Sequence, residues 1–552
     1  MEKLTSKPVF IILLLTIISS CFFFSGLDGI ALTDPDETFY AQTAKEMLER
    51  GEWLTPYLYG KPQFEKPILF YWALELSFKI FKVNEFAARF PSAMFGFMGL
   101  IAMYLLGRLL FNNRTGIIAA VILATNVEYV ILSRACITDM ALFFFMLLGS
   151  LFFFYGYLRA RPVFYVLSSM AFGLAVLTKG PVFVALPLVT ILVFLAASKD
   201  LKALKKLPYL WCIAGFVIVT APWYLVMYKI HGAPFIDTFF GFHNVTRFLE
   251  SEHKIGSQVY YNIPVIMGGF FPWSAFLPFG LWRAYKNAFS AGHPEKTGAV
   301  FALAWFVVFF LFFTASSTKL PTYIFPVFLS AALMTAAGWD RLVDARPAPG
   351  TIKAMSLSYY LMITVIVLGS IGALIYVKID EPALFSGVLV TCSILILGII
   401  PSLIAFTGRK YLWAFCLVVY ALAILLYPVK RLVLSQIEPY ETSKEVSQVL
   451  SFVMNEGEKV GAESRFMEGI AFYTGKYPVN LDKHHDLVQF ISSDERGWCV
   501  MKDKNHRELY ELETKPYCLK PSYMIFKVGK RSIVTNTMPD DGIYMLKRER
   551  KQ

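Results

Sequence analysis

The chain has 552 residues, of which 56% are hydrophobic, 16% aromatic and 17% charged, and its mean hydropathy is +0.54. This composition excludes an ordinary soluble globular protein and predicts an integral membrane protein. A net charge of +12 would suggest nucleic acid as a partner of a soluble protein, but here the basic residues stand mostly in short loops between apolar runs. Membrane topology explains them, and we expect no nucleic-acid binding.

Apolar runs long enough to cross a bilayer, about 20 residues each, recur along the chain. We predict about thirteen spans, at residues 9–27, 88–111, 115–133, 138–158, 163–179, 181–198, 209–229, 262–282, 298–315, 320–339, 355–377, 384–407 and 411–428. Residues 66–82 are apolar but short and are interrupted by Glu75 and Lys79. They predict an amphipathic helix at the membrane interface.

The charges of the loops support this topology. Every second loop carries an excess of Lys and Arg, as cytoplasmic loops do. The remaining loops carry charges of both signs and are mostly acidic. They also contain the ionisable residues that are best suited to catalysis or ligand binding. We therefore expect the functional site on the outer face of the membrane.

The first outer loop, residues 30–87, is longer and more charged than a simple connection requires. Its acidic start predicts a helix over residues 36–50, with Asp34 or Asp36 as the capping residue, and Gly51 ends that helix. Its second half, FEKPILFYW, returns to the membrane as an aromatic segment that begins with a Glu-Lys pair.

Beyond the last span the sequence becomes less hydrophobic. We assign residues 1–430 to a transmembrane domain and residues 431–552 to a small α/β domain outside the membrane. Within the latter, residues 443–457 predict a helix, and residues 459–463 and 467–481 predict strands. Cys499 and Cys518 would lie in an oxidising compartment, where they can form a disulfide.

Ionisable groups at a membrane boundary are functional candidates, because an unpaired charge there costs several kcal/mol. The outer loops supply both signs: acidic Asp36, Glu65 and Asp139, and basic Lys66, Lys179, Arg247 and Lys319. A site that breaks the bond between a sugar and a lipid phosphate needs cations on the departing phosphate. It also needs carboxylates that deprotonate an acceptor hydroxyl or hold the sugar.

Each candidate also has a purely structural interpretation. The aspartates can be helix caps, and Glu65 and Lys66 can form an interfacial ion pair. Lys179 can extend its amine to the interface, and Arg247 can contact lipid headgroups. Lys319 with Tyr323 can be part of a basic and aromatic belt.

Taken together, several phrases resemble the bacterial aminoarabinose transferases that modify lipid A, which are relatives of the protein O-mannosyltransferases and have the glycosyltransferase-C fold. The phrases occur in family order and are DPDETFYAQTAKEMLERGEW, FEKPILFYW, SRACITDM, LTKGP, RFLES with PWSAFLP, and STKLPTYIFP. The resemblance covers the whole length of the chain.

The resemblance implies an inverting enzyme of the bacterial inner membrane, with its active site and C-terminal domain in the periplasm. Its donor would be 4-amino-4-deoxy-L-arabinose on undecaprenyl phosphate, and its acceptor lipid A or another component of the cell envelope. Asp36, Asp139 and Glu65 would be the acidic residues of the catalytic cavity. The carrier phosphate would be held by Lys66, Arg247, Tyr323 and Lys179. Glu37, Tyr40 and Lys319 would complete the cavity.

Two departures from the family pattern limit this inference. Phe39 replaces a common arginine, and His243-Asn244 stands where Glu-His is usual. The sugar and any divalent metal therefore stay open. Transfer of a hexosamine or mannose to lipid, polysaccharide or protein is the nearest alternative. A transporter or flippase of lipid-linked sugars is the alternative of another class.

Overall fold

The computed structural model describes residues 8–239, 258–290, 292–344, 346–502, 523–528 and 531–536. These residues divide into two compact units. The helical unit comprises residues 1–27, 64–73 and 89–429, and the sheet unit comprises residues 28–63, 74–88 and 430–552. The chain is mostly helical, as expected.

Helices make up the helical unit, and the long ones are apolar. In chain order they are α2 (Pro8–Ser19), η1 (Ser20–Phe24), α5 (Glu85–Leu110), α6 (Asn113–Ala124), α7 (Val127–Ser133), α8 (Asp139–Arg159), α9 (Pro162–Lys179), α10 (Val182–Ala197), η2 (Leu201–Lys206), α11 (Tyr209–His231), α12 (Ala233–Ile236), α14 (Asn262–Gly269), η4 (Trp273–Phe276), α15 (Leu277–Phe289), α16 (Lys296–Ala315), η5 (Pro321–Ile324), α17 (Val327–Leu342), α18 (Pro349–Asp380), η6 (Pro382–Leu384), α19 (Phe385–Thr407) and α20 (Tyr411–Pro428). The first turn of α5 belongs to the sheet unit, and α4 (Leu69–Phe81) is shared between the two units.

Among the described residues, eight helices are long and apolar enough to cross a membrane, and two bent pairs raise the number to as many as ten. The chain is therefore a multi-pass membrane protein. The other three predicted spans coincide with helices under 18 residues long, namely α2 with η1, α10 and α17. The count of thirteen stays a prediction.

Two predicted spans are not continuous. The span expected at 115–133 bends by 69° between α6 and α7, where the side chain of Asn126 accepts a hydrogen bond from the Tyr129 amide and starts a new helix. The span expected at 262–282 bends by 113° after α14, because Pro272 follows Phe271 and has no amide hydrogen to donate.

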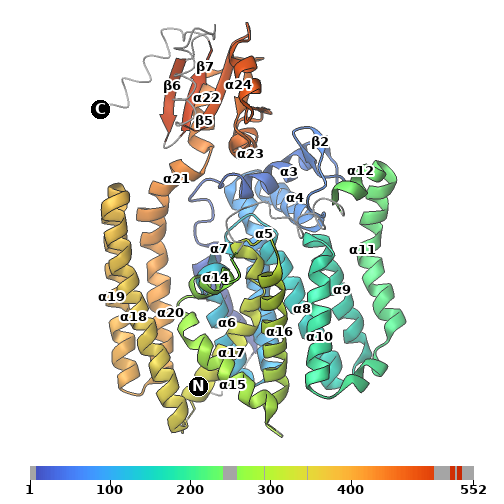
Figure 1. Ribbon diagram of the computed structural model, residues 1–552, viewed down its shortest axis with the longest axis vertical. Helices are drawn as coiled ribbons and strands as arrows, with labels where there is room; N and C mark the ends of the chain where they lie inside the picture. The colour runs from blue at the N-terminus through green and yellow to red at the C-terminus, as the bar shows by residue number, and fades with distance from the viewer. Residues whose placement is uncertain are drawn as a thin grey trace. The chain divides into compact units, whose positions relative to one another are not determined.

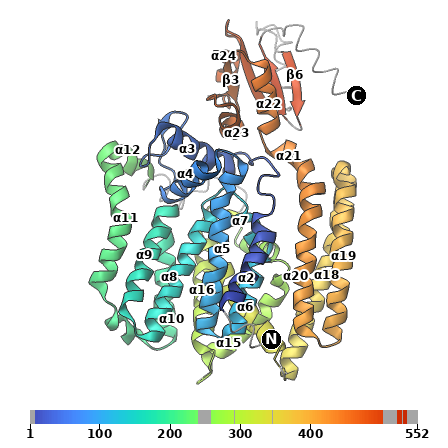
Figure 2. The same cartoon turned by 180° about the vertical axis from the view of Figure 1, so that it is seen from behind.

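Within the helical unit, α8 packs against α9, and α9 against α11, so these helices lie side by side in Figure 1 and Figure 2. The helices α18, α19 and α20 form another antiparallel group. Two buried tryptophans make hydrogen bonds in the interior of the helical unit: Trp273 donates to the Thr125 hydroxyl (2.9 Å), and Trp305 donates to the Pro326 carbonyl (2.8 Å).

The sheet unit contains a mixed five-stranded sheet. Its elements are α3 (Asp36–Arg50), β1 (Tyr57–Leu58), β2 (Lys61–Pro62), η7 (Val429–Leu434), α21 (Ser435–Glu441), α22 (Lys444–Val453), β3 (Lys459–Ala462), α23 (Ser464–Thr474), β4 (Val479–Asn480), α24 (His484–Ile491), β5 (Gly497–Lys502), β6 (Tyr523–Val528) and β7 (Arg531–Thr535). The strand order is β4-β3-β5-β7-β6, with β3 parallel to β4 and β5 and with β7 antiparallel to β5 and β6.

Helices cover both faces of this sheet. One face is covered by α22 and α23 through a cluster around Leu450, Ile470 and Trp498, and the other is covered by α24 through Ile491 and Cys499. The helix predicted at 443–457 is observed as α22, and the strand predicted at 459–463 as β3.

The strand expected over residues 467–481 is wrong for its first half, which is the helix α23. The buried positions Phe466, Met467, Ile470 and Ala471 follow helical spacing. Gly475, at φ 73°, then ends the helix, and only Val479–Asn480 form a strand.

The helix predicted at 36–50 is confirmed as α3, and Gly51 ends it at φ 68° with its amide bonded to the carbonyls of Leu48 and Met47. The expected aspartate cap is wrong, because Pro35 occupies the capping position and no side chain caps the helix. The carboxylate of Asp34 instead makes tertiary contacts, and Glu37 bonds back to Thr33. Tertiary contacts have outweighed the local preference of Asp34 for a helix-capping position.

Candidate functional site

Three residues singled out from the sequence meet in the helical unit. Lys179 Nζ lies 2.6 Å from Asp139 Oδ1 and 5.2 Å from the centre of the Tyr323 ring. Asp139 is the first residue of α8, Lys179 is the last residue of α9, and Tyr323 lies in η5. Because α8 and α9 are antiparallel neighbours, the start of one adjoins the end of the other.

The Asp139–Lys179 ion pair is largely removed from solvent, with side chains about one-tenth exposed. The Lys179 ammonium also lies over the Phe183 ring, 5.4 Å from its centre. Aromatic faces attract cations, so the lysine is held by one carboxylate and two rings. Asp139 and Lys179 therefore neutralise each other in this structure, whereas the sequence had suggested separate roles for them.

Lys319 supplies a second positive charge on the segment that carries Tyr323. The turn between α16 and η5 is closed by a hydrogen bond from the Ser316 hydroxyl to the Thr318 carbonyl (3.0 Å). Lys319 is only 6% exposed, and within the described part of the chain it makes no hydrogen bond or ion pair. A lysine side chain that is mostly removed from solvent favours an anion beside its ammonium, so this position suits an anionic ligand.

Glu65 and Lys66 lie half-buried in the non-helical segment before α4. The preceding residue, Phe64, fixes this segment within the helical unit. Its ring packs against His231 (5.0 Å between centroids) and edge-on against Phe235 (5.5 Å). These rings belong to the end of α11 and to α12, and α11 packs against the helix that ends at Lys179.

Asp36, Glu37 and Tyr40 lie on the first turns of α3, in the sheet unit. Asp36 is the first helical residue and is exposed. Glu37 is buried, and its Oε2 accepts hydrogen bonds from the amide and the hydroxyl of Thr33 (3.0 and 3.1 Å). Tyr40 is buried edge-on against Phe39. Glu37 thus stabilises the start of α3, and Asp36 is the carboxylate that faces solvent.

Arg247 and His243 lie outside the described residues, so the expected phosphate contact of Arg247 stays a prediction and a divalent metal stays open. Cys518 also lies outside them, while Cys499 is a free, buried cysteine, which does not bear out a disulfide between the two. Within the described ranges, no group of three or more His, Cys, Asp and Glu side chains is arranged to hold a metal ion.

The sequence did not single out Glu128, on the first turn of α7. Its carboxylate lies close enough to Asp139 for the two charges to interact, so it belongs to the surroundings of the Asp139–Lys179 pair. The sequence signal that could have identified Glu128 is the presence of an ionisable residue inside an apolar run.

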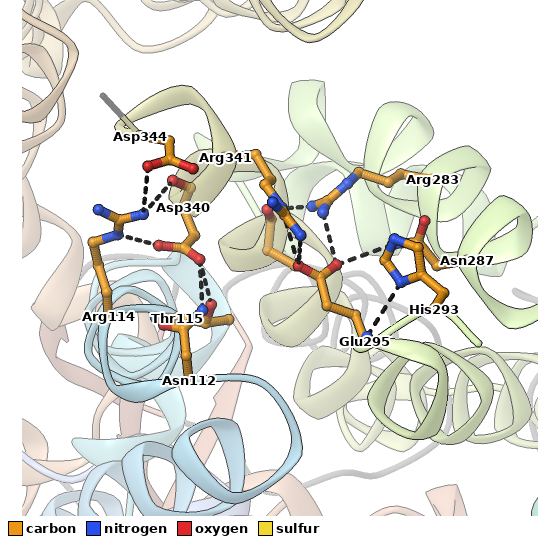
Figure 3. A network of polar contacts seen from close by, with 11 residues as sticks. Asn112, Arg114, Thr115, Arg283, Asn287, His293, Glu295, Asp340, Arg341 and Asp344 are labelled. Atoms are coloured by element: carbon orange, nitrogen blue, oxygen red, sulfur yellow. Dashed lines mark hydrogen bonds and ion pairs between the residues drawn. The ribbon is translucent and has the colours of Figure 1, made fainter. Parts of the chain in front are cut away.

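A second polar cluster lies at the other end of the helical unit (Figure 3). Glu295 accepts hydrogen bonds from Arg283 (2.7 Å), Asn287 (3.0 Å) and Arg341 (2.8 Å). Asp340 accepts from Arg114, from Asn112 (2.8 Å) and from Thr115 (2.9 Å). These carboxylates are saturated by protein donors, so the cluster is suited to joining helices rather than to holding a ligand.

The chain resembles known sugar transferases in sequence. Residues 65–225 match the family model described as dolichyl-phosphate-mannose-protein mannosyltransferase. Over 313 residues the chain is 33% identical to the undecaprenyl phosphate-alpha-4-amino-4-deoxy-L-arabinose arabinosyl transferase of Yersinia enterocolitica, and the alignment covers 55% of each chain. The match thus spans about half the length of that relative. An uncharacterized protein of Aquifex aeolicus is 30% identical over 371 residues, 67% of this chain and 70% of that protein.

A solved structure has a similar fold. The crystal structure of ArnT from Cupriavidus metallidurans bound to undecaprenyl phosphate superposes with a TM-score of 0.80, over 95% of this chain and 98% of that one, at 20% identity. This likeness establishes the glycosyltransferase-C type of fold for the chain.

Proposed function

We propose the function of this chain from one premise: it belongs to the family of the bacterial undecaprenyl phosphate-aminoarabinose arabinosyl transferases. It transfers a sugar, 4-amino-4-deoxy-L-arabinose, from an undecaprenyl phosphate carrier to lipid A. The observation that carries this proposal is the convergence of Asp139, Lys179 and Tyr323, with the largely buried Lys319 four residues before Tyr323 on the same segment.

The reaction is a displacement at the anomeric carbon of the sugar. An acceptor oxygen forms the new bond, and the bond to the carrier phosphate breaks with its electron pair on the phosphate, which implies inversion. Negative charge therefore grows on the phosphate in the transition state, and donors held ready for it lower the barrier. Lys66, Lys319, Arg247 and the Tyr323 hydroxyl are the groups that we assign to this role.

The acceptor decides what the carboxylates do. A lipid A phosphate is already anionic near neutral pH and needs no general base, so Asp36 and Glu65 then recognise the ammonium group of the sugar. A hydroxyl acceptor must lose a proton, and the exposed carboxylate of Asp36 is then the base. Asp139, paired with Lys179, keeps that lysine in place under either reaction.

The charges of the loops support the orientation that we propose. In this proposal the chain lies in the bacterial inner membrane, with the loop at 30–87 and the domain at 431–552 in the periplasm. The loops at the other end carry the Lys and Arg excess that marks the cytoplasmic side.

Two other functions use the same features differently. Transfer of a hexosamine or mannose would use the same phosphate site but other contacts to the sugar. Phe39, which stands where the family commonly has an arginine, is the sequence difference that supports this alternative. A transporter usually holds its charges near the bilayer midplane at broken helices. Asp139 and Lys179 instead stand at the very ends of α8 and α9, which favours the enzyme.

Mass spectrometry of lipid A tests the proposal. Cells that lack the chain are compared with cells that express it, or its variants Asp36→Asn, Lys66→Ala and Lys319→Met, at matched abundance. We expect a pentosamine-sized mass gain with the wild type. Lys66→Ala and Lys319→Met should lower it about 100-fold or more, the range for a lost transition-state donor, and Asp36→Asn should lower it by a similar factor as a lost base or sugar contact. The control is Lys61→Ala, an exposed lysine of the same loop, which should keep the gain.

Other outcomes separate the alternatives. If lipid A stays unmodified while the purified protein still releases undecaprenyl phosphate from a lipid-linked sugar, the reaction type stands and the acceptor is wrong. If the protein consumes no such donor but moves it across vesicle membranes, it is a transporter.

A further inference from the structure

The chain directly before α3 is joined to the C-terminal part of the sheet unit. Thr33 and Thr442 form an antiparallel β-bridge, and the Asp34 amide donates to the Glu441 carbonyl (2.9 Å). The amide of Leu32 also donates to the Tyr473 hydroxyl (2.8 Å). Residues more than 400 positions apart in the sequence therefore fix the backbone that leads into the helix of Asp36.

The side chain of Asp34 is the centre of this junction. It is 6% exposed, it accepts hydrogen bonds from the hydroxyls of Ser443 and Thr38 (3.1 Å for the latter), and its Oδ2 lies 3.5 Å from Arg531 Nη2. Gly469 of α23 lies so close that a Cβ there would collide with the Asp34 carboxylate. Only glycine at this position lets α23 and Asp34 pack as they do.

Arg531 brings a positive charge to the junction from β7. Its side chain is about 1% exposed and lies over the Phe466 ring, 4.6 Å from its centre. Within the described residues Asp34 is its ion-pair partner, while Nη2 also donates to the Tyr440 carbonyl at 3.4 Å. A guanidinium so far from water depends strongly on its carboxylate partner.

From these contacts we infer that Arg531 and Asp34 are positioning residues for the transferase: through them the C-terminal sheet holds the N-terminal end of α3, and with it Asp36. The inference rests on the proposed function and gives the C-terminal part of the chain a role in it. Asp36 is two residues from Asp34 and is the first residue of its helix. Its carboxylate therefore moves with any shift of the junction.

Two variants disturb the junction in different ways. Arg531→Met removes the charge but keeps the length of the side chain. Gly469→Ala keeps both charges and adds one methyl group against Asp34. Arg531→Lys restores the charge, and Lys459→Ala is the control, because Lys459 pairs with Glu495 on the exposed surface of the same unit.

Two measurements on purified full-length protein are compared, hydrogen exchange of the amides at 36–40 and steady-state transfer from an undecaprenyl phosphate-linked sugar. Displacing a catalytic group by about 1 Å can lower a rate about 100-fold. We expect faster exchange at 36–40, kcat lower by about 10- to 100-fold and an almost unchanged donor KM in Arg531→Met and Gly469→Ala. Arg531→Lys should recover part of the rate, and Lys459→Ala should match the wild type.

Unchanged kcat in a folded Gly469→Ala protein would overturn the inference, and so would a loss that appears only as a higher donor KM. If the wild type transfers no sugar, the proposed function fails, and the exchange experiment then decides separately whether the sheet holds the start of α3. Unchanged exchange at 36–40 in both variants overturns that coupling as well.

Discussion

At the scale of single residues, Asp34 shows how burial and charge oppose each other. The pKa of its carboxyl is raised to about 7: burial and the negative charge of Glu468 raise it, while Arg531, Ser443 and Thr38 lower it. Desolvation is the largest of these effects. Asp34 therefore exchanges its proton close to neutral pH, whereas in an unfolded chain it would do so near 3.8.

A pH-dependent stability follows from this shift. Between the two pKa values the folded state keeps a proton that the unfolded state has lost, so the stabilisation is present at low pH and is lost as the pH rises through about 7. A shift of about three pKa units corresponds to about 4 kcal/mol. Apparent unfolding temperatures in detergent, for wild type and Asp34→Asn from pH 4 to 8, measure it.

We expect the wild type to lose stability relative to Asp34→Asn as the pH rises, because asparagine does not titrate. A difference between the two proteins that is constant over this range, or that grows in favour of the wild type with rising pH, would contradict the assignment to Asp34.

The sequence could identify individual site residues but not their partners. Asp139, Lys179 and Tyr323 were conspicuous as polar groups at the ends of apolar runs. That Lys179 pairs with Asp139 depends on how α8 and α9 pack, which side-chain type does not determine. The same limit explains why Asp34 was expected to cap α3, when its carboxylate instead contacts Ser443 and Arg531, more than 400 positions away in the sequence.

At the scale of elements, the saturated cluster of Figure 3 joins the ends of α15, α16 and α17. Glu295, just before α16, accepts from Arg283 on α15 and from Arg341 on α17. Removal of its carboxylate leaves the buried guanidinium of Arg283 uncompensated. A single carboxylate thus supports three helices.

We expect Glu295→Ala to lower the free energy of unfolding by about 3 to 5 kcal/mol, the range for breaking a buried ion pair. The matched control is Asp344→Ala, since Asp344 lies 3.8 Å from Arg114 and both side chains are nearly half exposed, and it should cost about 1 kcal/mol or less. Thermal unfolding in detergent compares them. Equal losses, or a lower kcat per folded molecule in Glu295→Ala alone, would contradict a structural role.

Element boundaries were predictable where local signals agree. The helix from Asp36 to the left-handed Gly51 is one example. The bends at Asn126 and before Pro272 were missed, because hydropathy averages over a whole window and does not register one capping or helix-breaking residue. In residues 467–474 aromatic and β-branched side chains favoured a strand, and the helical spacing of the buried positions outweighed them.

At the scale of the whole molecule, the distribution of charge along the chain sets one orientation in the membrane. The helix α11 offers a direct test, because it connects η2, which carries Lys202, Lys205 and Lys206, to α12, which begins at Ala233. Its 23 residues span about 34 Å at 1.5 Å per residue, enough to cross the hydrocarbon core. The two ends must then face opposite compartments.

Single cysteines at these two ends, in a chain whose native cysteines are replaced by alanine, measure the orientation. Both Ala233 and Lys202 are exposed. Because Lys and Arg are retained on the cytoplasmic side, we expect a membrane-impermeant maleimide to label Ala233→Cys in spheroplasts with an intact inner membrane and to label Lys202→Cys only after permeabilisation. The reverse pattern would place the loop of Asp36 in the cytoplasm, where lipid A modification on the outer leaflet is out of reach. Labelling of both before permeabilisation would mean that α11 does not cross the membrane.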